Sequence, residues 1–243
     1  CEDREGGALT IDSEGPPNRF LFDRIFWSDD PDLPCFASQQ DVAEYLSLHI
    51  GQHILAGHDS SVIAFGPTGA GKTFSLFAQL PDPPGATDAL LRMLDGLIAQ
   101  EEWDVTTSMS VLELIGDAFH DVLDGHNRVN LEQVLGEVHL RNCSSHRFAE
   151  AEQGVAILQR ALSRGRSGDT ALIVILDIAD NGTGPGASQH FIVDLMGCER
   201  KSNISRSTDA MREAASTGRT LSSLGAVLSG LATDGPHIPY RNS

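Results

Sequence analysis

A glycine-rich segment that ends in Lys-Thr constrains the fold of this 243-residue chain more than any other feature. Its residues are Gly66, Pro67, Thr68, Gly69, Ala70, Gly71, Lys72 and Thr73. The apolar run 61–65 precedes it and the run 74–77 follows it, which is the strand–loop–helix context of a phosphate-binding loop. Glycines allow backbone N–H groups to close around a phosphate, and the helix N-terminus behind the loop favours an anion. The segment therefore predicts a site for a nucleoside triphosphate.

Two side chains of this loop and one distant carboxylate predict how the triphosphate is held. Lys72 supplies a positive charge for the β- and γ-phosphates, and the Thr73 hydroxyl can ligate Mg²⁺. Such sites also need a carboxylate at the end of a neighbouring strand, which usually holds Mg²⁺ through water. Asp194 is the candidate because it ends the apolar run 191–193, and the nearby Gly197 can turn its N–H toward a γ-phosphate. The alternative for Asp194 is a simple cap of a strand-to-loop turn.

Composition and cysteine spacing describe an ordinary folded protein. The hydrophobic fraction is 40%, and no apolar run approaches the roughly 20 residues that span a bilayer. The first residues lack the basic-then-apolar pattern of a signal peptide. Cys1, Cys35, Cys143 and Cys198 form no CxxC pair, so a zinc site has no support and a disulfide framework is not expected. We expect reduced thiols in an intracellular protein.

The net charge of −17 argues against a general nucleic-acid binder. Residues 199–243 contain six Lys or Arg and four Asp or Glu, so they carry +2 and leave −19 for residues 1–198. This distribution is compatible with an acidic partner at the basic end of the chain. Ordinary scatter of surface charge explains it equally well.

Apolar runs and amphipathic stretches alternate along the chain. They predict a three-layer α/β fold with a mostly parallel central sheet and helices on both faces. Strands are expected at 20–22, 61–65, 105–115, 119–123, 172–178 and 190–195, with short strands and loops over 126–148. Helices are expected at 40–56, 87–100, 150–162 and 217–233, and directly after the phosphate-binding loop. No repeat or linker interrupts the pattern, so residues 1–243 are expected to form one domain.

Several segments resemble the kinesin motor domain family. Residues 194–200, Asp-Leu-Met-Gly-Cys-Glu-Arg, are similar to the kinesin switch II sequence Asp-Leu-Ala-Gly-Ser-Glu-Arg. Residues 237–243, His-Ile-Pro-Tyr-Arg-Asn-Ser, match a kinesin signature at every position. Residues 221–228 resemble the helix that follows switch II, and residues 20–26, 63–66 and 110–114 resemble kinesin strands. The similar segments lie in the order of the family and span nearly the whole chain.

The resemblance implies a kinesin-type fold and ATP hydrolysis coupled to microtubule binding, with ATP and Mg²⁺ as cofactors. It implies that Lys72 and Thr73 hold phosphate and Mg²⁺, that Asp194 anchors Mg²⁺ through water and that Gly197 senses the γ-phosphate. Glu199 would pair with a switch I arginine and help to position the attacking water. The implied contacts with tubulin, in a cytoplasmic protein associated with microtubules, are Arg200, Lys201, Arg206, Arg219 and Arg241.

The resemblance is weakest at switch I. Kinesins have Asn-x-x-Ser-Ser-Arg-Ser-His before a buried strand, whereas only Arg166 and Ser167 fit that pattern here and Gly168 replaces the His. Ser167 could still ligate Mg²⁺ and Arg166 could still meet Glu199, or the segment could be a plain surface turn. Pro67 also replaces the usual Gln of the phosphate-binding loop.

Two functions remain open from the sequence. One is an ATP-driven microtubule motor or depolymerase, which the intact phosphate-binding loop favours. The other is a structural microtubule-binding protein with a kinesin fold and weak or absent ATP turnover, which the degenerate switch I favours. The first and last strands of the family have no counterpart, so we expect the sequence to be part of a longer polypeptide. Direction of movement, cargo and oligomeric state are not predicted.

Overall fold

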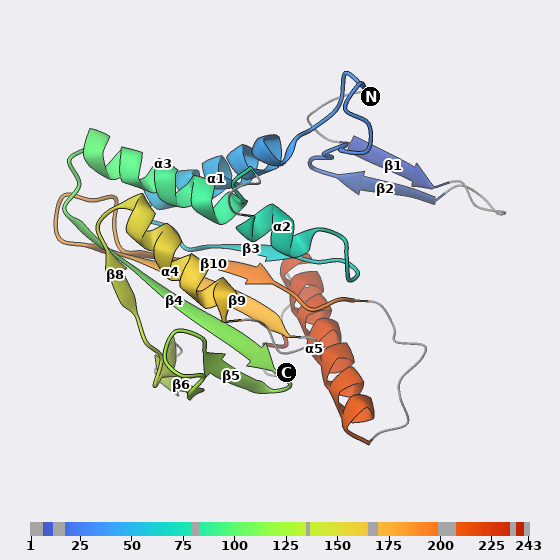
Figure 1. The fold of residues 1–243 in the computed structure, drawn as a ribbon. Helices are drawn as coiled ribbons and strands as arrows, with labels where there is room; N and C mark the ends of the chain where they lie inside the picture. The colour runs from blue at the N-terminus through green and yellow to red at the C-terminus, as the bar shows by residue number, and fades with distance from the viewer. Residues whose placement is uncertain are drawn as a thin grey trace.

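A mixed β-sheet forms the centre of the protein (Figure 1). The computed structural model describes residues 7–11, 18–78, 83–134, 137–164, 170–198, 208–233 and 237–240. Within these residues the sheet has eight strands in the order β3-β10-β9-β4-β5-β6-β7, with β8 paired to β4. The strands are β3 (Ser60–Ala64), β4 (Val105–Ile115), β5 (Ala118–Asp121), β6 (Arg128–Val134), β7 (Glu137–Arg141), β8 (His146–Phe148), β9 (Ala171–Asp180) and β10 (Ser188–Asp194).

The expectation of a mostly parallel sheet is wrong. Among the described strands of this sheet, β3 and β10 pair in parallel, and the remaining pairs are antiparallel. The reason lies in the connections, because Gly116-Asp117 joins β4 to β5 and residues 181–187 join β9 to β10. A parallel pair needs a crossover of a dozen or more residues, so these short connections produce hairpins.

Strand directions place four strand termini at one edge of the sheet. β9 lies between β4 and β10 and is antiparallel to both, while β10 is parallel to β3. β3, β4 and β10 therefore run in the same direction. Their carboxyl ends and the amino end of β9 share an edge, which is where the phosphate-binding loop leaves β3.

Three helices lie side by side over one face of the sheet (Figure 1). Periodic apolar residues fill the space beneath them. Leu90 and Leu94, from the helix over residues 86–100, are completely buried. The first helix begins at a capping box, in which the Ser38 side chain accepts from the Asp41 N–H and the Asp41 carboxylate accepts from the Ser38 N–H. The helices are α1 (Gln39–Leu55), α3 (Ala86–Gln100) and α4 (Ala151–Ser163), each within one residue of the predicted start.

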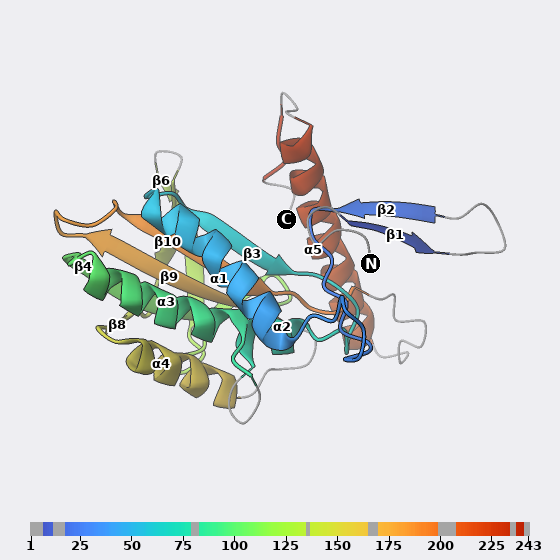
Figure 2. The same cartoon turned by 90° about the horizontal axis from the view of Figure 1, so that it is seen from above.

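The helix α5 (Thr208–Ala232) covers the opposite face. Val193 packs against the same buried cluster as Leu221 and Leu224 of α5, whereas the preceding residue Ile192 belongs to the core beneath α1, α3 and α4. Successive side chains of a strand point to opposite faces, so helices lie on both faces as predicted. Figures 1 and 2 show α5 apart from the other three helices. It begins nine residues before the predicted start at 217.

A separate hairpin and a disulfide occur near the N-terminus. The hairpin pairs β1 (Gly7–Ile11) with β2 (Asn18–Phe22) and lies outside the main sheet. Cys143 and Cys198 are free thiols, but Cys35 is in a disulfide, so the expectation of reduced thiols is wrong at this position. Its partner lies outside the described residues. The spacing of cysteines along a sequence does not reveal which of them the fold brings together.

A helix needs about 20 apolar residues to cross a bilayer. Within residues 7–240, apart from the gaps given above, no helix has both the length and the apolar character to cross a bilayer.

Candidate functional site

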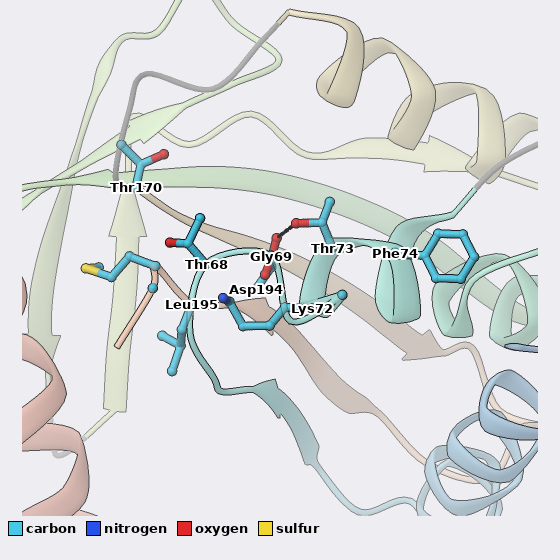
Figure 3. Close-up of a pocket in the computed structure, with 11 residues that line it drawn as sticks. Thr68, Gly69, Lys72, Thr73, Phe74, Thr170, Asp194 and Leu195 are labelled. Atoms are coloured by element: carbon cyan, nitrogen blue, oxygen red, sulfur yellow. Dashed lines mark hydrogen bonds between the residues drawn. The ribbon is translucent and has the colours of Figure 1, made fainter. Parts of the chain in front are cut away.

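The phosphate-binding loop forms one wall of a pocket of about 420 Å³ at the shared strand edge (Figure 3). It connects β3 to the short helix α2 (Lys72–Phe77). The segment after β10 and the residue before β9 supply the other walls. The lining residues are Thr68, Gly69, Gly71, Lys72, Thr73, Phe74, Thr170, Asp194, Leu195, Met196 and Gly197.

The backbone of the loop explains its glycines. Gly69 and Gly71 have φ angles of 81° and 83°, in the left-handed region that side chains with a Cβ rarely adopt. A Cβ at either position would have no heavy atom within 4 Å. Backbone conformation, not crowding, therefore requires glycine at both positions, and the space around the loop stays open to a ligand.

The ammonium group of Lys72 is held over the loop. Its Nζ donates to the carbonyl oxygens of Gly66 at 3.0 Å and Pro67 at 2.8 Å. Figure 3 shows its side chain extending among the other lining residues. Both acceptors are uncharged, so the lysine keeps its electrostatic attraction for an anion in the pocket.

Thr73 and Asp194 meet in the pocket although they are 121 residues apart in sequence, and the Thr73 hydroxyl donates to Asp194 Oδ2 at 2.5 Å. The parallel pairing of β10 with β3 places Asp194 beside Ala64, two residues before the loop begins. Asp194 is completely buried, with 0% of its surface exposed. A hydroxyl and a carboxylate are the oxygen ligands that Mg²⁺ prefers, so this pair fits that cation.

Groups of three or more His, Cys, Asp or Glu side chains that could hold an ion are absent from residues 7–240 outside the gaps. Mg²⁺ commonly takes one or two protein ligands and completes its shell with water and substrate phosphates. The Thr73 and Asp194 pair is consistent with that mode of binding.

The segment after β10 runs along the start of the phosphate-binding loop. Leu195 N–H donates to the Ala64 carbonyl at 3.3 Å, and Cys198 N–H donates to the Gly66 carbonyl at 3.2 Å. Gly197 lies between these anchored residues and lines the pocket. The structure therefore brings Gly197 into the same pocket as Lys72 and Thr73, and its role toward a γ-phosphate stays a prediction.

Phe74 and Thr170 line the pocket although sequence reasoning did not identify them. Phe74 directly follows Thr73, so its place next to the predicted magnesium ligand was an available signal. Thr170 is 3% exposed and donates its hydroxyl hydrogen to Oε1 of the buried Glu113 at 2.5 Å. A charged residue inside the apolar strand pattern of 105–115 was the available signal for Glu113.

The remaining predicted site residues divide into two groups. Arg219 lies on the exposed surface of α5, with Nη2 at 3.8 Å from Asp117 Oδ2, a surface ion pair of little energetic weight. Its role toward a partner stays a prediction. The other predicted residues lie outside the described residues: Arg166, Ser167, Glu199, Arg200, Lys201, Arg206 and Arg241.

The fold and the pocket define a class of protein. A phosphate-binding loop between a strand and a helix, with a buried carboxylate at the end of the neighbouring strand, is the arrangement of phosphate-loop nucleoside triphosphatases. The family described as "Kinesin motor domain" matches residues 4–243. The chain belongs to this family, which confirms the resemblance found in the sequence.

Curated relatives are similar over all or nearly all of the chain. Kinesin-like protein klp-20 of Caenorhabditis elegans is 30% identical over 267 aligned residues, which cover 100% of this chain and 40% of the relative. Kinesin-like protein KIF18B of Mus musculus is 29% identical over 252 residues, covering 95% of this chain and 29% of the relative. The chain therefore spans less than half the length of these relatives.

Solved structures confirm the kinesin-type fold. The motor and motor homology domain of Kar3Vik1 has a TM-score of 0.80 at 26% identity, covering 98% of this chain and 64% of that chain. KIF14 with ADP in complex with a microtubule has a TM-score of 0.82 at 22% identity, covering 100% of this chain and 76% of that chain. At 22% identity the second likeness shows the fold alone.

Proposed function

We propose that the chain binds ATP together with Mg²⁺ and couples ATP hydrolysis to binding of microtubules. The observation that carries this proposal is the contact between Thr73 and Asp194 inside a phosphate-loop pocket of a kinesin motor fold. KIF14, which has a similar fold, has been solved with ADP and with AMP-PNP in complex with a microtubule. These complexes are the reason for proposing ATP as the nucleotide and the microtubule as the partner.

The predicted site residues have proposed tasks in this reaction. Lys72 would neutralise charge on the β- and γ-phosphates. Asp194, whose carboxylate accepts the Thr73 hydroxyl hydrogen, would anchor Mg²⁺ through water. Bound Mg²⁺ would offset the charge that develops on the phosphates. Gly197 would donate its N–H to the γ-phosphate. Outside the described residues, the sequence assigns Glu199 the role of pairing with Arg166 and positioning the attacking water. Ser167 completes the predicted metal ligands.

The packing of α5 supports a coupling between the pocket and a partner surface. Leu195 and Met196 line the pocket and also pack against Leu221 and Leu224 of α5. A shift of the segment after β10 on nucleotide binding would therefore press directly on α5. We propose that α5 contacts tubulin through Arg219, and that the basic residues predicted from the sequence, Arg200, Lys201, Arg206 and Arg241, add to this contact. Such contacts place the protein on the microtubule cytoskeleton.

A second function has a specific observation in its favour. Only Arg166 and Ser167 fit the switch I pattern, and this segment normally supplies groups that sense the γ-phosphate and hold the attacking water. A protein that binds microtubules and nucleotide without turnover would retain the pocket and lose this pattern.

Steady-state ATPase assays with and without microtubules separate the two functions. We expect microtubules to raise the rate several-fold and the protein to pellet with them. If the protein pellets with microtubules but they do not raise its ATPase rate, the structural function is correct and the motor function is wrong. Absence of nucleotide binding and of pelleting would refute both.

A further inference from the structure

A buried carboxylate lies behind the pocket, at a strand position where the pattern calls for an apolar residue. Met109 and Val111 of β4 contribute to the core beneath the helices. Glu113 follows two residues later on the same face and is only 1% exposed. A buried carboxylate is costly unless hydrogen bonds compensate for its lost hydration. The presence of a buried glutamate at this position therefore needs either a structural or a functional explanation.

The partners of Glu113 connect it to the pocket. In the pairing of β4 with β9, Leu172 lies opposite Glu113, so Thr170 is the diagonal neighbour on the same face. The Thr170 hydroxyl donates to Glu113 Oε1 at 2.5 Å, and His126 Nδ1 lies 3.7 Å from Oε2. One carboxylate thus contacts a pocket residue and the turn between β5 and β6.

Thr170 lies at a particular end of the pocket. Figure 3 shows Thr170 on the side toward which the Lys72 side chain extends, whereas Phe74 lies on the other side. The lysine of a phosphate-binding loop reaches the β- and γ-phosphates. Thr170 therefore lies at the end where the terminal phosphate is expected. Donation to Glu113 fixes the rotation of the hydroxyl and with it the direction of the oxygen lone pairs.

We propose that Glu113 is a positioning residue of the nucleotide site, which orients the Thr170 hydroxyl so that the pocket favours a triphosphate over a diphosphate. The inference rests on the proposed binding of ATP. The oriented oxygen accepts a hydrogen bond from water bound to the γ-phosphate, an interaction that a diphosphate does not offer. Removal of either partner should therefore weaken triphosphate binding selectively.

The test is a pair of equilibrium titrations with fluorescent ADP and fluorescent AMP-PNP. We expect Thr170→Val to weaken AMP-PNP binding about three- to tenfold, the effect of one hydrogen bond, and to change ADP binding by less than about twofold. Thr170→Ser keeps the hydroxyl and should restore most of the AMP-PNP affinity. Glu113→Leu should weaken AMP-PNP binding as much as Thr170→Val does. Glu113→Gln should weaken it less, because the amide oxygen still accepts the hydrogen bond. The double variant Glu113→Leu/Thr170→Val should have the same affinity as either single variant.

Thr107→Val is the matched control. Thr107 lies at the opposite end of β4, is 4% exposed and donates to the Phe148 carbonyl at 2.5 Å, so its burial and hydrogen bond resemble those of Thr170. Thr107→Val should change neither the ADP nor the AMP-PNP affinity.

The inference is overturned if Thr170→Val weakens ADP and AMP-PNP equally, or if it behaves like Thr107→Val. If Glu113→Leu does not fold, the comparison of Thr170→Val with Thr170→Ser decides. Failure of the unsubstituted chain to bind either nucleotide would instead refute the proposed function, and the inference with it.

Discussion

We expect His190 to make the stability of this protein depend on pH. It lies in β10, the strand that ends at Asp194, and is 1% exposed. Its Nδ1 is 2.7 Å from the Ser60 hydroxyl of β3, and its Nε2 is 3.0 Å from the Ser188 hydroxyl. Burial lowers the pKa of His190 from 6.5 to about 4, with Asp59 opposing the shift and His53 adding to it. The folded protein therefore keeps this imidazole neutral at a pH where the unfolded chain binds a proton.

The sign and size of the effect follow from this difference. Because the pKa in the folded state lies below that in the unfolded state, the stabilisation is complete above pH 6.5 and is lost as the pH falls toward 4. Within this window the free energy of unfolding should fall by about 1.4 kcal/mol per pH unit, or about 3 kcal/mol in total. That loss is a large fraction of the stability of an ordinary domain.

Urea unfolding at several pH values between about 7 and 4 measures this dependence when the wild type is compared with His190→Gln. Glutamine can still hydrogen-bond the two serine hydroxyls but does not titrate. Between pH 7 and 4 the free energy of unfolding of the variant should therefore fall by about 3 kcal/mol less than that of the wild type. Both proteins have the same carboxylates, so the contribution of these groups to the pH dependence cancels when the wild type and His190→Gln are compared. His49→Gln, on the exposed surface of α1, is the control for loss of a histidine. Equal pH slopes for the wild type and His190→Gln would refute the reasoning.

Three further predictions concern the pocket and the partner surface. Asp194→Asn should bind nucleotide with little dependence on Mg²⁺, and an unchanged dependence in a Mg²⁺ titration would remove Asp194 from the metal site. Gln39 donates to the carbonyls of Phe74 and Ser75 at 3.2 Å, so Gln39→Ala should lower the free energy of unfolding by about 1 kcal/mol. Gln40→Ala, which removes only a bond to Glu44 on the same helix, should have a smaller effect in the same urea titration. Arg219→Glu should weaken microtubule pelleting more at low than at high salt, and pelleting that is unaffected at any salt would exclude this contact.

The secondary structure was predictable because it depends on neighbours in sequence. The periodicity of residues 87–100 and 105–115 predicts a helix and a strand, and the structure has α3 and β4 there within one residue. The phosphate-binding loop is also a contiguous motif, so its glycines and its Lys-Thr pair predict the bend and the ligand together. In the same way, the similarity to kinesins rests on short contiguous segments.

The direction of strands and the pairing of distant residues were less predictable. An apolar strand such as 172–178 looks the same in a parallel or an antiparallel sheet, and the short loop 181–187 was the only signal for a hairpin. The disulfide at Cys35 likewise depends on which cysteines the fold brings together. The expected parallel sheet and reduced thiols were wrong for the same reason, because both depend on contacts that a local pattern does not contain.

The sequence by itself determined that this chain is a kinesin-family domain with a phosphate-binding loop, because the loop and the family signatures are consecutive residues with fixed chemistry. Only the tertiary structure decided which residues surround that loop. It placed Asp194 against Thr73 by pairing β10 with β3, and it placed Glu113 behind Thr170 by pairing β4 with β9. Strand order and register set these contacts, and they follow from the packing of the whole sheet, not from any one segment.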